Sequence, residues 1–176
     1  MAGLYIDHGW DMGWCIRARR GVASGVLHSR PGNPDDGDRL LAQSDWLTAT
    51  LKRLEAAGER LDEIRYEQIT FVGKNSAEVL HAHGKQLGNL ERWAALKKQP
   101  KPRGLEWSVI KKHISGHRSA SRETVKEIVE KLFPNVTDHN QASAVAVMCT
   151  ATNQHPFHNA GKPPHARQHA MAANRS

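Results

Sequence analysis

Two acidic residues stand at the ends of short apolar segments. Asp7 closes the segment GLYID, and Glu67 follows Tyr66 in the segment DEIRYEQIT. A buried strand that ends in a carboxylate is unusual, because a charge there must be paired, hydrated or bound to a metal ion. When two such strands are parallel neighbours, their carboxyl ends meet at one edge of the sheet, where functional residues collect. The pattern indicates a site for a hard cation, which takes oxygen ligands, or else a structural salt bridge or an exposed strand end.

A stretch nearer the C-terminal end changes abruptly from polar to apolar. Residues 137 to 147 read TDHNQASAVAV, which indicates a helix that enters the core. Thr137 or Asp138 fits an N-cap, because short side chains with an oxygen accept hydrogen bonds from free backbone N–H groups. Alternatively, the polar residues at the start of this helix carry chemistry. The sequence leaves both interpretations open.

A run of cations between residues 97 and 122 is the most distinctive charge feature. Its members are Lys97, Lys98, Lys101, Arg103, Lys111, Lys112, Arg118 and Arg122. Glu106 is the one acidic residue within the run. Such a cluster is typical of a surface that binds phosphates, and it predicts a DNA affinity that falls steeply with salt. The alternative is a solvated charged surface without a ligand.

Hydrophobic patterning predicts the elements that position these residues. GLYID, GWCIRARR and GVASGVLHS are short segments separated by turns that contain glycine, which indicates an antiparallel β-meander. DEIRYEQIT predicts a fourth strand with Ile64 and Tyr66 on one face and Arg65 and Glu67 on the other, and LEWSV predicts a fifth. Helices are expected from Leu40 to Gly58, from Ser76 to about Lys98, over VIKKHIS, from Glu123 to Phe133, and over the stretch from residue 137. The order predicts an α/β fold with a five-stranded mixed sheet flanked by helices.

Composition limits the number of domains and the class of partner. With 176 residues and 39% hydrophobic content, the chain has enough material for one core. We expect one domain over residues 1–151 and a basic, disordered tail over residues 152–176, which contains histidine and proline but no acid. Lys and Arg outnumber Asp and Glu by 25 to 18, and this net charge of +7 points to a polyanion such as nucleic acid or a membrane surface. No run of eighteen apolar residues occurs, so a membrane-spanning role is not expected.

Four segments carry a resemblance by their order and spacing. LYIDHGWDMGW, IRYEQ, SVIKKHISGHRSASRETV and TDHNQASAVAV together resemble the RuvC-type Holliday-junction resolvases of the ribonuclease H-like superfamily, especially the compact versions carried by bacteriophages. The likeness covers roughly residues 3 to 150. It implies a homodimeric endonuclease that cuts four-way or branched DNA with Mg²⁺, or with Mn²⁺, in the cytoplasm of a bacterial cell or a phage-infected host.

The resemblance also implies roles for individual residues. Asp7 and Glu67 match the first two acidic ligands, and Lys112 or Lys111 falls beside the scissile phosphate. In the last helix, Ser143 stands where the family usually has an aspartate, and Gln141 where it often has a glutamate. The candidate catalytic residues are Asp7, Glu67, Lys112 and His139, the last as ligand or general base. The candidate metal ligands are Asp7, Glu67, Asp138, His139, Asn140 and Ser143. The candidate DNA-binding residues are Lys98, Lys101, Arg103, Lys111, Lys112, Arg118 and Arg122.

Two functions remain open at this point. The first is a structure-specific nuclease that hydrolyses a phosphodiester with two cations about 4 Å apart. The second is a branched-DNA-binding protein on the same fold whose cleavage is weakened or lost. Retention of Asp7 and Glu67 favours the nuclease, whereas the neutral Ser143 favours the binding protein.

Overall fold

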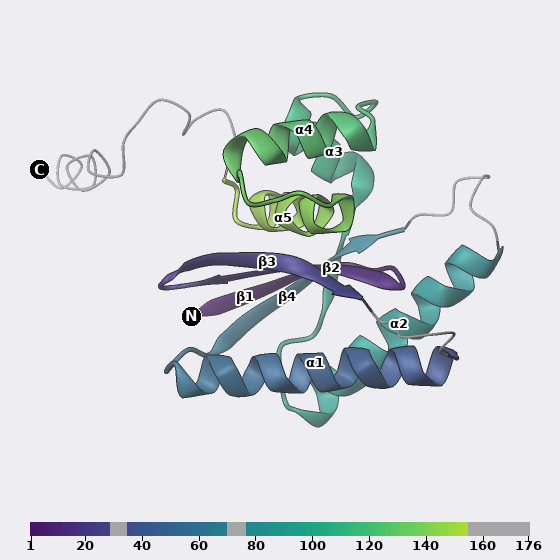
Figure 1. Cartoon of the computed structure of the whole chain (residues 1–176), viewed down its shortest axis with the longest axis vertical. Coiled ribbons are helices and arrows are strands. Elements are labelled where there is room, and N and C mark those ends of the chain that lie inside the picture. Colours follow the sequence, from purple (N-terminus) through teal and green to yellow (C-terminus); the bar gives the residue numbers. More distant parts are fainter. Residues whose placement is uncertain (29–34, 70–76, 155–176) are drawn as a thin grey trace, which may run out of the picture.

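The computed structural model describes residues 1–28, 35–69 and 77–154 (Figure 1). Five strands form one mixed sheet in the order β3-β2-β1-β4-β5. Their bounds are β1 Ala2–Asp7, β2 Asp11–Ala18, β3 Gly21–His28, β4 Leu61–Gln68 and β5 Arg103–Glu106. The first three strands pair in antiparallel fashion, whereas β4 runs parallel to both β1 and β5. The predicted α/β fold with a five-stranded mixed sheet is therefore confirmed.

Helices cover both faces of the sheet, as Figure 1 shows. The helices α1 Asp36–Ala56 and α2 Ala77–Leu96 lie on one face. The other face carries α3 Trp107–Ser115, α4 Arg122–Leu132 and α5 His139–Ala151. Helix α5 packs directly on β1 and β2, and α3 and α4 pack against α5. None of the described helices is long and apolar enough to cross a bilayer.

Alternation along the strands divides the core into two halves. Leu4 and Ile6 of β1 and Ile64 and Tyr66 of β4 belong to the cluster that packs with α1 and α2. Tyr5 belongs to the cluster around α5. Because successive side chains on a strand point to opposite faces, the residues after Ile6 and Tyr66 return to the α5 side. Asp7 and Glu67 therefore belong to the α5 side of the sheet, while His8 belongs to the α1 and α2 side.

Helix α5 lies unusually close to the sheet. Its residues from 141 to 149 are all buried, and three of them are the alanines Ala142, Ala144 and Ala146. An added Cβ on Gly13 of β2 would lie 1.9 Å from the backbone oxygen of Asn140. The absence of a side chain at Gly13 is therefore what lets the first turn of α5 approach the strand. This contact fixes where α5 presents Ser143.

Most element boundaries agree with the sequence prediction to within a few residues, but the fifth strand does not. The expected strand over LEWSV is wrong, because β5 ends at Glu106 and α3 begins at Trp107. Pairing with β4 defines the strand: Arg103 lies opposite Arg65, and Glu106 opposite Gln68. The aromatic and β-branched residues that suggested a strand instead follow the pairing segment and enter a helix. Ser76 and residues 155–176 of the predicted tail lie outside the described residues.

Candidate active site

Asp7 and Glu67 come together at the carboxyl ends of two adjacent parallel strands. Ile6 of β1 is paired with Tyr66 of β4, so the next residue on each strand lies at the same level of the sheet. Both side chains are buried, with 6% of Asp7 and 2% of Glu67 exposed. The structure therefore brings together the two carboxylates that the strand ends predicted. Since an unpaired buried charge is costly, two ionised carboxylates at this place require a nearby cation.

Burial and mutual repulsion make this carboxylate pair reluctant to ionise. Desolvation raises the pKa of Asp7 well above its usual value, and the neighbouring charge of Glu67 raises it further. Arg122 and a hydrogen bond from Ser143 lower the pKa of Asp7, but they do not cancel the effect of burial. Burial also raises the pKa of Glu67, and Arg122 opposes this shift. Two such carboxylates share protons as a pair, and a nearby cation favours their charged forms.

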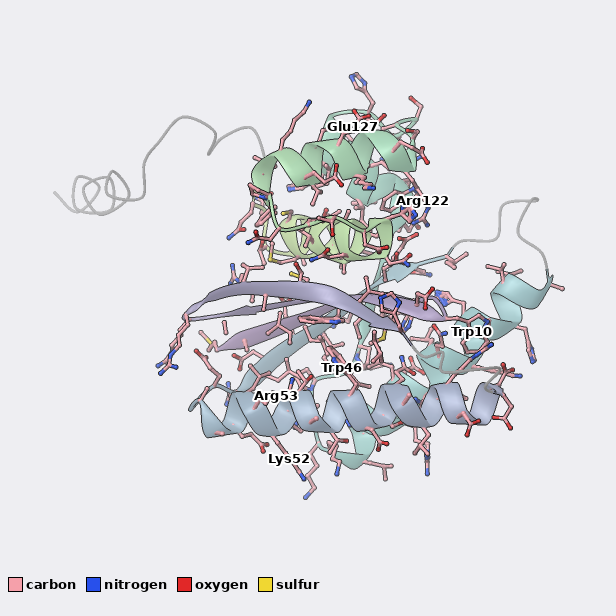
Figure 2. The ribbon with its side chains drawn as sticks, in the orientation of Figure 1. Trp10, Trp46, Lys52, Arg53, Arg122 and Glu127 are labelled. Atoms are coloured by element: carbon pink, nitrogen blue, oxygen red, sulfur yellow. The ribbon has the colours of Figure 1, made fainter. Side chains whose placement is uncertain are left out.

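Arg122 is the cation that the structure places at this pair. Its Nη2 donates to Glu67 Oε1 at 2.5 Å, and its Nη1 lies 3.4 Å from Glu67 Oε2. The same Nη1 donates to Ser143 Oγ at 3.3 Å. The guanidinium also lies over the ring of Trp107, 4.6 Å from its centroid. Arg122 thus links β4, α5 and α3 around the carboxylates, while 49% of its own side chain stays exposed (Figure 2).

The sequence did not predict the contact of Arg122 with Glu67, and Arg122 was assigned to the DNA-binding cations instead. Its position follows from the start of α4, where Ser121 is the N-cap and its hydroxyl accepts a hydrogen bond from the backbone N–H of Thr124. Arg122 is the first residue of the helix, so its side chain projects from the end that lies near β4. A pairing across 55 residues leaves no signal in local spacing. A serine cap before a lone arginine was the only available hint.

The polar start of α5 caps the helix. Asp138 is the N-cap, and its carboxylate accepts hydrogen bonds from the backbone N–H groups of Asn140 at 2.7 Å and Gln141 at 3.2 Å. Gln141 also has a structural role, because its amide donates to the hydroxyl of Ser24 and its carbonyl accepts from the backbone N–H of Thr137. Of the two interpretations of TDHNQASAVAV, the capping one is thus what the structure contains.

The remaining candidate ligands on α5 differ in their surroundings. Ser143 is buried and lies at the pair, whereas His139 is exposed. Asn140 is half-buried. Within residues 1–28, 35–69 and 77–154, no group of three or more His, Cys, Asp or Glu side chains could hold a metal ion. Asp138 accepts the capping hydrogen bonds of α5 and His139 is exposed, so the role of either as a metal ligand beside Asp7 and Glu67 stays a prediction.

The predicted DNA-binding cations lie on several elements around β5. Lys98 and Lys101 lie between α2 and β5, Arg103 begins β5, and Arg118 lies between α3 and α4. These four are exposed, as is Lys112 on α3, while Lys111 beside it is half-buried. All of them are solvent-accessible on or near the edge strand of the sheet. Arg122 differs from the other cations of this set, because it already pairs with Glu67.

The sheet order and the helices on both faces define a mixed α/β fold in which two carboxylates lie at the ends of the adjacent strands β1 and β4. No protein-family model matches the sequence, and no curated protein sequence matches it significantly. Among solved structures, the chain is similar to Thermus thermophilus RuvC, with a TM-score of 0.65 and 20% identity over 86% of this chain and 93% of that chain. It is also similar to T. thermophilus RuvC in complex with a Holliday junction substrate, with a TM-score of 0.68 and 18% identity over the same shares of the two chains. The resemblance read from the four segments is thus confirmed at the level of the fold.

Proposed function

We propose that the protein binds four-way or branched DNA and hydrolyses a phosphodiester at the site of Asp7 and Glu67. The observation that carries the proposal is the pair of buried carboxylates at adjacent parallel strand ends, with Arg122 beside them. Two buried acids whose pKa values are raised by their surroundings do little to stabilise a fold, and such groups cluster at functional sites. The similarity to a RuvC structure in complex with a Holliday junction substrate supports the choice of branched DNA.

The donor set of the site fits one hard divalent cation. Asp7 and Glu67 supply carboxylate oxygens, and Ser143 adds a neutral hydroxyl. Oxygen donors of this kind suit Mg²⁺, with Mn²⁺ as the alternative, and a cation would relieve the repulsion that keeps the pKa of Asp7 high. Bound there, the metal would help to activate water and to neutralise charge on the phosphate. The described residues supply carboxylates for one cation, so the expected second cation has no comparable set of ligands.

Side chains of this chain would do the rest of the work. Arg122 offers a planar guanidinium, which can exchange one of its contacts with Glu67 or Ser143 for a phosphate oxygen, because the group is half-exposed and has several donors. Lys111 and Lys112 on α3 would offset negative charge on the phosphate or the leaving group. Lys98, Lys101, Arg103 and Arg118 would hold the flanking backbone. These contacts position the DNA without reading its sequence.

The proposed assembly is a homodimer, which would present two sites to the two opposite strands of a four-way junction that must be nicked. The exposed surface of α2 supports this proposal. Gly84 and Gly88 lie one turn apart and are exposed, and an added Cβ at either would have no neighbour within 4 Å. Glycines cost about 1 kcal/mol each in a helix relative to alanine, so their presence there suits the close approach of a second helix.

A binding protein that does not cut is the second candidate, and two observations favour it. Ser143 provides a hydroxyl where a third carboxylate would strengthen a metal site, and Arg122 already neutralises Glu67. A metal ion that binds Glu67 must compete with the guanidinium of Arg122 for the same carboxylate. The two candidates differ in whether the site accepts a metal ion strongly enough to cut.

A comparison of the protein with Ser143→Asp on a synthetic four-way junction tests the proposal. The substrate controls are a linear duplex of the same sequence and reactions with EDTA in place of Mg²⁺ or Mn²⁺. We expect paired nicks on the junction that require the metal, and faster nicking by Ser143→Asp, because a third carboxylate favours the cation. Cutting by Ser143→Asp alone would support the binding protein instead. Equal affinity for junction and duplex, with no cutting by either protein, would overturn the proposal.

A further inference from the structure

A second group of buried polar side chains lies on the opposite face of the sheet from Asp7. His8 directly follows Asp7 and is 7% exposed, and neither of its ring nitrogens has a hydrogen-bond partner among the described residues. His83 of α2 is also buried, and its Nε2 finds no partner within the described part of the chain. Gln86, one turn further along α2, has an Oε1 that is likewise without a described partner. Native proteins pair most buried polar atoms, so three such side chains in one place need an explanation.

These side chains line one cavity. Its volume is about 340 Å³, and its walls include Trp10, Ile69, Val79 and Ala82 beside His8, Gly9, His83 and Gln86. The rings of His8 and His83 are 5.2 Å apart, and Tyr66 lies 5.4 Å from His8. The cavity therefore combines apolar and aromatic walls with a few convergent polar atoms, which is the usual composition of a site for a small organic group.

The lining points to a neutral ligand. His8 and His83 are buried beside each other, with ring centroids 5.2 Å apart, and no described ion pair involves either ring. Each imidazole can offer a hydrogen-bond donor and an acceptor, and the Gln86 side chain adds a carbonyl acceptor that has no partner among the described residues. No Lys, Arg, Asp or Glu is among the described lining residues, which argues against a phosphate or carboxylate ligand. The volume is far larger than a metal ion requires, and the described residues contain no group of three or more ligating side chains there.

The position of the cavity relates it to the carboxylate site. His8 and Asp7 are consecutive at the carboxyl end of β1, and their side chains point to opposite faces of the sheet. The cavity and the carboxylates therefore lie at the same end of the strands, one on each face. Figure 2 shows Arg122 and Trp10 on opposite sides of the sheet, both toward the same end. A DNA strand whose phosphate reaches Asp7 and Glu67 would have its adjacent nucleotide within reach of this edge.

We propose that the cavity of His8, His83 and Gln86 binds one unpaired nucleobase at the branch point of the DNA. This inference rests on the proposed function. A base offers a planar apolar body and an edge of donors and acceptors, which matches apolar walls with neutral polar atoms at one side. Enclosure of an unpaired base provides affinity that a fully paired duplex cannot obtain without disruption of a base pair. The site would thus contribute to the choice of branched over linear DNA.

Junctions with a single abasic nucleotide test the inference through binding alone, in EDTA, so that cleavage plays no part. A series of four-way junctions carries the abasic nucleotide at each position next to the branch point in turn. We expect one position at which base removal weakens binding by about tenfold, the size expected for one enclosed base. His83→Phe keeps a ring of similar size but removes the polar nitrogens. In this variant, the intact junction should bind as weakly as the abasic one, so that the tenfold difference disappears.

The matched control is His28→Phe at the end of β3, where the histidine is exposed and lies two strands from β1 in the sheet order. It should retain the full difference between intact and abasic junctions, and circular dichroism should show the same fold for both variants. Gln86→Leu should act like His83→Phe, and it provides a second test if His83→Phe does not fold. Tight junction binding that no abasic substitution changes would overturn the nucleobase cavity and leave the proposed function intact. Failure of the unmodified protein to prefer junctions over duplex would overturn both.

Discussion

The guanidinium of Arg122 lies against the carboxylate of Glu67, with Nη2 at 2.5 Å from Oε1 and Nη1 at 3.4 Å from Oε2. Glu67 is almost completely buried, whereas Arg122 is half-exposed. One buried acid is therefore compensated by a cation that reaches it from the solvent side. The neighbouring acid, Asp7, has no described ion pair of this kind, and its pKa is raised well above the usual value. The site thus contains one partly neutralised and one poorly neutralised carboxylate.

Removal of Arg122 should destabilise the protein and strengthen its response to metal. Arg122→Gln leaves Glu67 buried without its cation, so we expect the free energy of unfolding at pH 7 to fall by about 1–3 kcal/mol, less than for a fully buried pair because the arginine is half-exposed. Added Mg²⁺ should then raise Tm more in the variant than in the parent, because the metal no longer competes with the guanidinium. Arg118→Gln, which replaces an exposed arginine, is the control and should change neither quantity. An equal Mg²⁺ response in both proteins would show that Arg122 and the metal do not compete.

The contribution of Asp7 to the free energy of unfolding should be less favourable at neutral pH than at acid pH. Its pKa in the folded state is raised above 3.8, so the folded protein holds a proton that the unfolded chain has already released. The stability that this proton provides is present below pH 3.8 and is lost as the pH rises through the folded-state pKa. Asp7→Asn removes this loss, so the variant should gain stability over the parent as the pH rises from 4 to 7. Denaturant titrations across that range measure the difference.

The matched control for this pH dependence is Asp11→Asn on β2, where the carboxylate is half-exposed and lies 3.4 Å from His28 Nδ1. It should follow the parent over the same range, apart from the small effect of that exposed contact. A constant difference between Asp7→Asn and the parent from pH 4 to 7 would contradict the raised pKa of Asp7.

Gly13 should be necessary for the contact between α5 and the sheet. In Gly13→Ala the new Cβ meets the backbone of Asn140, which cannot move without the helix, so we expect a loss of about 1–3 kcal/mol in the free energy of unfolding. Asn140→Ala retains the backbone oxygen at this contact and should not reproduce the loss. Chemical denaturation of the three proteins gives the answer. A neutral Gly13→Ala would mean that α5 can shift freely and does not hold Ser143 in place.

Lys111 and Lys112 should contribute to DNA binding through phosphates. Replacement of both by Glu should weaken binding to junction and duplex alike, and it should lower the slope of log affinity against log salt by about 0.9 for each lost phosphate contact. The control is Lys52→Glu, an exposed lysine of α1 on the far side of the sheet (Figure 2). Unchanged affinity and slope in the double variant would move the DNA surface away from α3.

The strand ends show what could be predicted from the sequence. Two apolar strands that end in acids were enough to predict that Asp7 and Glu67 meet, because strand alternation and parallel pairing are local rules. Asp138 and His139 were equally consistent with a cap or a ligand, since both roles use the same side chains at a helix start. The structure shows Asp138 as the cap, and the place where α5 begins depends on how Gly13 admits the first turn of the helix.

Other features could not be predicted, because they depend on contacts between distant segments. Arg122 reaches Glu67 across 55 residues, and His8 meets His83 only because α2 packs under β1. The fifth strand was misplaced for the same reason: β5 extends only as far as its partner β4 supplies hydrogen bonds, and the strand-forming residues of LEWSV begin too late. Such pairings become visible only when the sheet is assembled.

Cleavage of a four-way junction by the protein and by Asp7→Asn, in the presence of Mg²⁺ or Mn²⁺, tests the central claim most directly. Asp11→Asn controls for the loss of a charge near the same strands. We expect cleavage by the parent and by Asp11→Asn, and none by Asp7→Asn, which should still bind the junction at least as tightly because a negative charge near the phosphate is gone. Cleavage by Asp7→Asn at the rate of the parent would contradict the assignment of Asp7 and Glu67 as the site of hydrolysis.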